Sequence, residues 1–561
     1  MRALAASHGN KAERGAALVL VLITVSIFLI LMGSLIDVLA VESQNAIESE
    51  NAQSALTAAY SGVDLMVLSI EEFYQNSINN GPPPSSVDCS FAKPGGGTVT
   101  TTCHAVLTQT WNGNGLNYFL IDSTGSAVPS PNQEVDREVL ALVKEVPFGA
   151  YSHFSETENS NTGGKVYYAS GQNFDGPVYS GGPMRIMYTS TDNTPIFPVG
   201  FTTVGTEKDI TWIDTVDGDH TQPNTPAEVN SVFGTSTPTF APNGIPLPGF
   251  GQNLVIFSEA YYGDSTHDDS QDLSNAGATK GVFVNGGNAN CAKGVLCTGI
   301  FVSGSASLSS TSVAGNGDLS SGSQTWVFQG TGGSNSWTGN YTVTVNFANN
   351  TTTVTDPSGG TTTYNGAASG EPNSTDLGNG AIFVDGSLTV DDGSTVHGQY
   401  TLAVPDPPVN SESITLAGSL TYANDPYKNP TQPSQDELAL WADTINLNSL
   451  DSNPEIEGMI LTGYANECQD PHCGGWFANG YCNRNNCKGG GSGPLDLFGS
   501  DIENMRGKMG DVDVNGNIID GYKRVSQYDA RLGAVPPPFS PTTNLYSIVA
   551  LSDQGTGLSQ P

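Results

Sequence analysis

The sequence predicts a mainly β protein of the α+β class, in which one long N-terminal helix precedes a large all-β domain. Three observations predict it. Residues 16–36 are uncharged and apolar, and these 21 residues are enough for one helix to cross a hydrocarbon core of about 30 Å. An apolar stripe at helical spacing then continues to about residue 76. Beyond residue 81, short strand-like segments alternate with Gly, Asp and Asn turns.

The charges on either side of the apolar run indicate its orientation. Three basic residues precede the run, and no Lys or Arg follows it before Lys93. Positive charge stays on the cytoplasmic side of a membrane, so we expect the bulk of the chain to be exported. The alternative is a cleaved secretory signal peptide. A membrane anchor over residues 16–36 is favoured, because the run exceeds the ~7–15 residues of a signal h-region and the helical pattern continues beyond Asp37.

The second part of the helix is predicted to be amphipathic. Its apolar residues recur at i, i+3, i+4 and i+7, which places them on one helix face. They are Ala52, Ala55, Leu56, Ala59, Val63, Met66, Val67 and Ile70. We expect one helix from about Ala16 to about Asn76, of which the first third is the anchor and the last part packs on a globular domain.

The start of the chain combines several features. A short basic leader ends at Gly15, the small residue Ala16 follows, and an apolar run leads into the amphipathic stretch. This combination resembles a type IV pilin precursor, and it is most similar to the PilX-type minor pilins at residues 14–19 and 58–63. The resemblance covers about residues 14–70.

The resemblance implies a processing route. Residues 1–15 would be a leader peptide, prepilin peptidase would cut between Gly15 and Ala16, and the new N-terminus would carry the methylation of this family. Residues 16–80 would be the pilin-like helix. The chain would reside in the bacterial inner membrane before assembly and then in a pilus at the cell surface, with an extracellular C-terminal domain. Its partners would be other pilins and the inner-membrane assembly machinery.

One position departs from the major pilins, which carry Glu at the fifth mature position. Here that position is Leu20. A buried Glu in a helix bundle needs a cationic partner, which in major pilins is thought to be the N-terminal amine of a neighbouring subunit. PilX-type proteins and the K-type minor pseudopilin of type II secretion also lack this Glu. The resemblance therefore implies a tip, priming or low-abundance role rather than that of the repeating subunit.

Composition limits the classes of function. Only 13% of the residues are charged, Gly numbers 67 of 561, and the formal net charge is −36. Low charge with abundant Gly is typical of an exported all-β protein with many turns. Such acidity excludes binding of nucleic acid through its phosphates, which needs a basic patch.

The eight cysteines fall in close pairs along the chain. An even count in an exported chain predicts disulfides, and we prefer pairing between sequence neighbours. The pairs are Cys89 with Cys103, Cys291 with Cys297, Cys468 with Cys473, and Cys482 with Cys487. The last four cysteines allow three connectivities, and a zinc site near His472 is the alternative for them. Disulfides are favoured, because the spacings are loose for zinc and the exported compartment disfavours bare thiolates.

The rest of the chain divides into regions that differ in composition and strand pattern. We expect a strand-rich pilin-like region at 81–150, a β-solenoid domain at 151–535 with a hairpin insertion at 326–364 and a Cys-rich surface loop at 466–491, and an extended C-terminal tail at 536–561. The strands have three to five residues, are separated by Gly, Asp or Asn turns and recur at irregular intervals. This pattern favours a right-handed β-helix. The alternative is a β-sandwich. Residues 382–390 also resemble a domain of unknown function that often follows PilX-type N-termini.

One segment matches the start of a calcium loop. Asp511, Asp513 and Asn515 would offer oxygen ligands, Gly516 would make the turn, and Asp520 would replace the Glu that is missing at the twelfth position. The alternative is a β-hairpin with an Asn-Gly turn. The hairpin is favoured, so we expect no cofactor here, with calcium as the alternative for this segment.

Two acidic loops are weaker metal candidates, because such runs are more often solvated turns. They comprise Asp214, Asp217, Asp219 and His220, and Asp264, His267, Asp268, Asp269 and Asp272. No Gly-x-Ser-x-Gly, His-Glu-x-x-His or phosphate-loop motif occurs, and no linear spacing identifies the facing acids of a glycosidase. We expect a structural, non-enzymatic minor pilin or assembly protein. The alternatives are a displayed adhesin that binds glycan or a surface, and an anchored carbohydrate-active enzyme.

Overall fold

The computed structural model divides the chain into two compact units. Unit 1 comprises Met1–Trp111, Tyr118–Lys144 and Tyr546–Pro561, and unit 2 comprises Asn112–Asn117 and Glu145–Leu545. The structure describes residues 11–75, 82–92, 100–113, 116–130, 133–158, 166–169, 172–188, 195–206, 209–214, 218–220, 225–241, 244–264, 266–286, 293–331, 336–369, 379–405, 412–449, 453–464, 474–478, 493–512 and 518–553.

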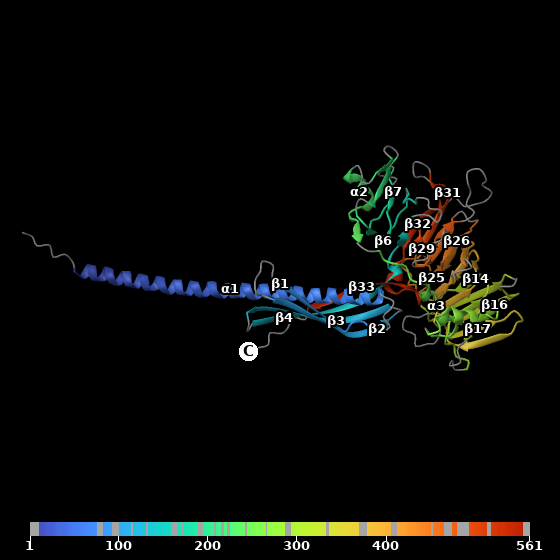
Figure 1. Ribbon diagram of the computed structural model, residues 1–561, viewed down its shortest axis with the longest axis horizontal. Coiled ribbons are helices and arrows are strands. Elements are labelled where there is room, and N and C mark those ends of the chain that lie inside the picture. The colour runs from blue at the N-terminus through green and yellow to red at the C-terminus, as the bar shows by residue number, and fades with distance from the viewer. Residues whose placement is uncertain are drawn as a thin grey trace, which may run out of the picture. The chain divides into compact units, whose positions relative to one another are not determined.

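Unit 1 is built on helix α1, Lys11–Gln75, which spans 65 residues. The segment has no Pro to interrupt the backbone hydrogen bonds. All residues from 22 to 50 are exposed, whereas the buried positions after residue 50 recur at helical spacing. Figure 1 shows the first part of α1 running past the strands of its own unit. The predicted division of the helix into an apolar part and a packed part is confirmed, and the helix begins five residues earlier than expected.

The packed part of α1 lies on a five-stranded sheet with the order β1-β2-β3-β4-β33. The strands are β1 Ser86–Ala92, β2 Thr100–Gly113, β3 Leu116–Ser130, β4 Gln133–Pro147 and β33 Thr542–Asp553. β1 pairs antiparallel with β2, and β3 pairs antiparallel with β4. The first four strands are consecutive and lie in the region predicted to be strand-rich, whereas the fifth comes from the end of the chain.

The place of β33 corrects the expectation for residues 536–561. These residues do not form only an extended tail, because β33 completes the sheet of unit 1. Tyr546 packs its ring against Tyr74 of α1 and Phe119 of β3, with centroids 5.8 and 5.2 Å apart. Its backbone N–H donates to the carboxylate of Glu71 at 2.9 Å. Unit 2 is therefore an insertion between the fourth and fifth strands of the sheet.

Helix and sheet approach each other closely where glycines allow it. A Cβ on Gly125 would lie 2.0 Å from the carbonyl oxygen of Ala55, and a Cβ on Gly62 would lie 2.3 Å from Oγ of Ser123. Ser123 donates its hydroxyl to the carbonyl of Ala59 at 2.7 Å. Small residues at this contact allow the close backbone approach that a larger side chain would prevent.

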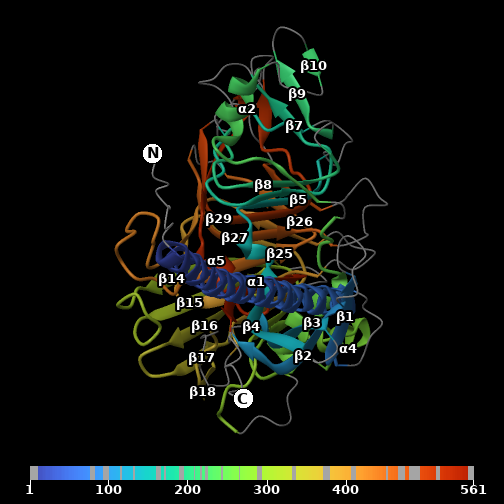
Figure 2. The ribbon, with the colours of Figure 1, turned by 90° about the vertical axis from the view of Figure 1, so that its left-hand side faces the viewer.

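Unit 2 consists mainly of three ladders of parallel strands, and Figure 2 shows parts of the first two. The first ladder is β13 Ile300–Ser303, β19 Ala381–Asp385, β22 Gln399–Ala403, β25 Glu437–Ala442, β27 Glu455–Thr462, β29 Pro494–Met505, β5 His153–Thr157, β6 Val178–Ser180 and β8 Phe201–Val204. The second is β14 Ala306–Val313, β20 Leu388–Val390, β23 Ser413–Leu416, β26 Thr444–Leu447 and β28 Trp476–Ala478.

The third ladder shares two long strands with the first. It comprises β21 Ser394–Val396, β24 Leu420–Tyr422, the first residues of β27 and β29, and β32 Lys523–Tyr528. β27 and β29 pass from one ladder to the other at Gly458 and Gly499, which pair in register and have φ of +141° and +152°. A Cβ on Gly499 would lie 1.9 Å from the carbonyl oxygen of Gly458, so only glycine fits this position.

The first ladder joins distant parts of the chain. β5 follows unit 1 directly in the sequence but pairs with the second half of β29, nearly 350 residues later. Side chains on the inner faces of the strands form two large buried clusters, one of which contains Trp326 and Trp476 and the other Trp441. The mainly β fold with a long N-terminal helix is confirmed. The described sheets are open rather than closed.

The remaining elements decorate these ladders. An antiparallel extension of β14 contains β15 Ser323–Gly330, β16 Asn340–Asn346, β17 Thr351–Thr355 and β18 Thr361–Asn365, at the predicted insertion. The others are η1 Phe148–Ala150, β7 Arg185–Met187, β9 Thr211–Asp214, β10 Gly218–His220, α2 Pro226–Phe233, β11 Thr239–Ala241, α3 Phe250–Tyr261, α4 Ser270–Ala276, β12 Gly281–Phe283, β30 Gly510–Val512, β31 Ile518–Gly521 and α5 Arg531–Ala534.

The expected surface loop at 466–491 needs one correction. Its described residues are 474–478, and they include strand β28. Trp476 is fully buried and pairs in register with Ile445 of β26. The middle of this Cys-rich segment is therefore a strand of the second ladder, because Trp476 fills the core between neighbouring strands.

Candidate functional site

The exposed half of α1 is the first candidate functional surface. The helix contains an 18-residue window with a mean hydropathy of 2.4, and none of that window is buried within the chain. Phe28, Leu29 and Ile30 are all more than 60% exposed. Large contiguous apolar surfaces on a protein mark contacts with a membrane or with other proteins. By length and composition, this is the one described helix that could cross a membrane.

The other half of α1 anchors that surface to a folded unit. Ala59, Val63, Met66 and Ile70 are at most 1% exposed and pack against the sheet of unit 1. Their spacing matches the predicted stripe. A disulfide joins Cys89 of β1 to Cys103 of β2, which lie opposite each other in register. The helix therefore presents its apolar half from a rigid support.

Gly15 and Ala16, the residues of the predicted peptidase cut, lie within the described backbone of α1, and their side chains are outside the described part. The backbone is helical on both sides of the Gly15–Ala16 bond. The cut at this bond remains a prediction.

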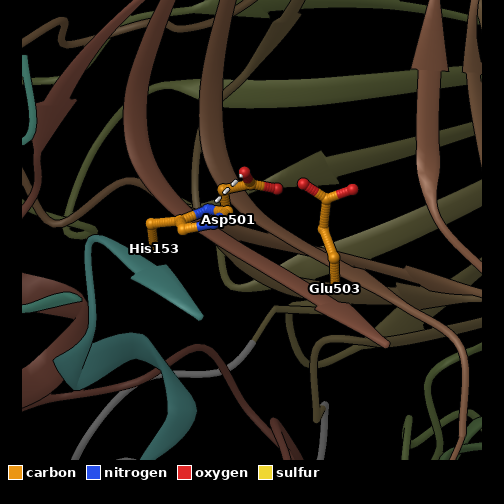
Figure 3. Close-up of side chains that lie close together, drawn as sticks. All are labelled: His153, Asp501 and Glu503. Atoms are coloured by element: carbon orange, nitrogen blue, oxygen red, sulfur yellow. Dashed lines mark hydrogen bonds and ion pairs between the residues drawn. The ribbon is translucent and has the colours of Figure 1, made fainter. Parts of the chain in front are cut away.

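The second candidate is a buried cluster of ionisable side chains where β5 pairs with β29 (Figure 3). Asp501 lies between His153 and Glu503 in this view. Nδ1 of His153 donates to Oδ2 of Asp501 at 2.9 Å. Arg524 of β32 pairs with both Asp501 and Glu503, and its contact with Glu503 is 3.4 Å long. All four side chains are at least 96% buried.

A further ion pair extends this cluster. Arg506 contacts Glu158 at 3.4 Å and stacks over the ring of Tyr168, 3.6 Å from its centroid. The hydroxyl of Tyr168 donates to the same Glu158 at 2.9 Å. Strand alternation places His153 and Ser155 on one face of β5, and Asp501 and Glu503 on one face of β29. These faces meet because the two strands are paired in register.

Burial and the neighbouring charges set the protonation states in the cluster. Burial, together with Arg506 and Arg524, lowers the pKa of His153 to about 3, so its imidazole is neutral. Burial and the neighbouring Asp501 raise the pKa of Glu503 to about 8. His153, Asp501 and Glu503 have the donor atoms of a metal site, with ligand atoms within 4.8 Å of one another. Because Arg524 already supplies the positive charge that a metal ion would bring, the cluster serves to hold together strands that are distant in sequence.

The third candidate is a second buried His–Asp pair. Nδ1 of His397 donates to Oδ1 of Asp436 at 2.8 Å, and Nε2 donates to the carbonyl of Ser321 at 2.8 Å. Asp436 also accepts from the backbone N–H groups of Gly398 and Asn424. Burial lowers the pKa of His397, but the hydrogen bond and charge of Asp436 outweigh it, and the net shift is upward. With an acceptor at each nitrogen, the charged imidazolium is the form that satisfies both.

The predicted metal loops lie in three places. β30 and β31 pair as an antiparallel hairpin in which Asp511 lies opposite Asp520, and the side chains of both residues, together with Asp513 and Asn515, are outside the described part. The side chains of Asp214, Asp217, Asp219 and His220 are outside it as well.

The loop from Asp264 to Asp272 is made of ordinary turn and cap contacts. Asp264 accepts from the backbone and hydroxyl of Thr266 and from Nδ1 of His267. Asp269 caps helix α4 by accepting from two of its backbone N–H groups. These contacts match the interpretation of the run as solvated turns.

The remaining cysteines are only partly described. Cys297 is disulfide-bonded, and its partner lies outside the described residues. Cys291, Cys468, Cys473, Cys482 and Cys487 also lie outside them. The choice among the connectivities of the last four cysteines, and between disulfides and zinc, stays a prediction.

Sequence reasoning missed the buried ionisable clusters. One signal for them is present: Asp501 and Glu503 alternate with apolar residues inside a strand-like run, and so do Glu455 and Glu457. Acids inside an apolar strand are almost never fully buried without a partner. Their partners Arg524 and His153 lie on other segments, so the sequence did not indicate which residues would meet.

Comparisons with known proteins found similarity among solved structures. A search of family models found no match, and a search of curated proteins found none. Among solved structures, the chain is similar to the competence-associated pilin ComZ from Thermus thermophilus, with a TM-score of 0.30 and 11% identity over 90% of this chain and 97% of that chain. Similarity at this level carries no inference about fold or function.

Proposed function

We propose that this chain is a pilin-like subunit that is held in the membrane by α1 and then incorporated through α1 into a type IV pilus or a related pseudopilus. The observation that carries the proposal is the division of one helix into two halves. Residues 22–50 are exposed and largely apolar, whereas the residues after them are packed on a five-stranded sheet. A helix of this kind needs lipid or other helices around its apolar half, and a filament core of packed helices would supply the latter.

The proposal extends to a minor pilin at or near the tip. Leu20 occupies the position where the major pilins carry Glu, as in the PilX-type proteins that the N-terminus resembles. Unit 2 is inserted between β4 and β33 and is more than twice as large as unit 1. A body of this size is easier to accommodate at the end of a filament than at every position along its shaft. We also infer that the parallel ladders of unit 2 are successive turns of a β-helix.

We propose a structural rather than an enzymatic role. In the cluster around His153, arginines neutralise the buried acids, and His397 is fixed at both nitrogens. The adhesin alternative would gain support from exposed aromatic side chains on unit 2. Within the described residues, the aromatic side chains more than about one-third exposed are Phe28, Tyr60, Phe91 and Trp111, all in unit 1.

The test is the mature N-terminus of the membrane-associated protein, measured by mass spectrometry with and without prepilin peptidase. We expect Ala16 to be the first residue only when the peptidase is present. A Gly15→Val substitution should leave the leader uncleaved. Gly33→Ala is the matched control in the same helix, because a Cβ there meets no atom within 4 Å. A start at Met1, or beyond Ile36, in the presence of the peptidase would refute the pilin route.

A further inference from the structure

The strongest unassigned feature is a group of three carboxylates in unit 2. Glu455 and Glu457 are the first and third residues of β27, so they project from the same face of the strand, while Ile456 between them points into the core. Asp425 lies in the loop after β24, which pairs with the start of β27. The three residues place ligand oxygens within 4.8 Å of one another.

Two carboxylate oxygens in this group have no hydrogen-bond partner among the described residues. Oε1 of Glu457 and Oε1 of Glu455 are both buried and unpartnered. Glu457 is only 1% exposed, and its other oxygen accepts from the backbone N–H of Tyr422. A buried carboxylate oxygen without a partner is costly, and structures normally provide it with a donor or a cation.

The local charge is not balanced by the protein itself. Lys428 pairs with Asp425 at 3.2 Å and with Glu455, but its side chain is 55% exposed and it approaches these acids from the solvent side. One ammonium therefore faces three carboxyl groups, and no ion pair to Glu457 occurs among the described residues.

We propose that Asp425, Glu455 and Glu457 bind a calcium ion. Hard carboxylate oxygens are the ligands that Ca²⁺ prefers, at roughly 2.3–2.6 Å. Oxygens on opposite sides of such an ion lie about 5 Å apart, so ligand oxygens that lie within 4.8 Å of one another can share one Ca²⁺. Mg²⁺ needs shorter bonds and a stricter octahedron. The ion would join the loop after β24 to β27, and the exposed Lys428 would move into solvent when the ion enters.

This proposal does not depend on the proposed function, nor on the hairpin at residues 511–520. If that hairpin also bound calcium, substitutions at each site would show which of the two sites binds the ion. Glu457→Gln and Asp425→Asn remove charge from the site proposed here. Glu457→Gln keeps the shape of a protonated carboxyl group, so we expect this variant to fold. Asp268→Asn is the matched control, because it removes one exposed carboxylate from an acid-rich loop elsewhere in unit 2.

The experiment is calorimetric titration of CaCl₂ into the full chain, purified in detergent and freed of divalent cations by chelation, with MgCl₂ as a second titrant. We expect a dissociation constant on the order of 0.1–1 mM, as in extracellular calcium modules. Glu457→Gln and Asp425→Asn should each weaken binding by about tenfold or more, because affinity follows ligand charge. Asp268→Asn should titrate like the unmodified chain.

Lys428→Met separates the proposal from its main rival, in which Lys428 is itself the permanent cation of the site. Under the proposal, removal of the competing ammonium tightens calcium binding several-fold, and added calcium restores the thermal stability of this variant. Under the rival, Lys428→Met lowers the unfolding temperature equally with and without calcium. The proposal would be overturned if the unmodified chain and Glu457→Gln bound calcium with equal affinity. It would also be overturned if the unmodified chain bound no calcium at concentrations several times the expected dissociation constant.

Discussion

Two regions of unit 2 contain the same pair of side chains in opposite chemical states. In each, Nδ1 of a buried histidine donates to an aspartate, at 2.9 Å from His153 to Asp501 and at 2.8 Å from His397 to Asp436. Nevertheless, the pKa of His153 falls to about 3, whereas that of His397 rises. The immediate partner therefore does not decide the state of either histidine.

The difference lies in what surrounds each pair. Around His153, burial and the guanidinium groups of Arg506 and Arg524 oppose a third positive charge, and Nε2 has no partner among the described residues. Around His397, Nε2 faces the carbonyl oxygen of Ser321, and the charges of Asp436 and Asp318 raise the pKa of the imidazole. The comparison shows that a buried His–Asp pair is neutral or ionic according to the net charge of its neighbourhood.

The largest expected effect comes from removing the charge that distinguishes the two regions. Arg524→Met would leave Asp501 and Glu503 buried without their cation, and we expect the free energy of unfolding of unit 2 to fall by about 3–5 kcal/mol. Urea unfolding of the full chain in detergent would measure it. Lys280→Met is the matched control, because Lys280 pairs with Asp385 at 3.6 Å and is 30% exposed, so its loss should cost less than about 1 kcal/mol. Similar costs for both variants would argue against a tightly coupled buried cluster.

The second expected effect is the pH dependence that His153 contributes. Its folded pKa lies below the value of about 6.5 in the unfolded chain, so between these values the unfolded state binds the extra proton. The stability contributed by neutral His153 is present above pH 6.5 and is lost as the pH falls, by about 2 kcal/mol between pH 6.5 and pH 5. His153→Gln should remove this loss. The measurement is the free energy of unfolding of the unmodified chain minus that of His153→Gln. This difference should be larger at pH 8 than at pH 5.

The smallest expected effect has the opposite sign. The folded pKa of His397 is raised, so its contribution is fully present below the unfolded pKa and is lost as the pH rises through the folded pKa. The stability difference between the unmodified chain and His397→Gln should be larger at pH 5.5 than at pH 8.5. If the free energy of unfolding changed equally with pH in His153→Gln and His397→Gln, the distinction between the two regions would be removed.

Much of unit 1 could be predicted from sequence because its signals are local. The length of α1 follows from an uninterrupted helical pattern, and the positions of its buried residues follow from the 3.6-residue period. Strands β1 to β4 lie within residues 81–150, where short strand-like runs occur in the sequence. Residues 548–551 read Ile-Val-Ala-Leu, a strand-like run in β33, but nothing near them in the sequence indicates that their partner is β4.

The sequence by itself determined the two-part helix, the mainly β character and the even number of cysteines in close pairs, because each depends on composition or on a short period. Only the tertiary structure decided that β33 closes the sheet of unit 1, that β5 pairs with β29, and that Glu457 meets Asp425. These contacts join segments up to about 400 residues apart. Strand pairing across such distances depends on the register of the complementary faces. No residue carries that information alone, so it arises only when the strands are paired.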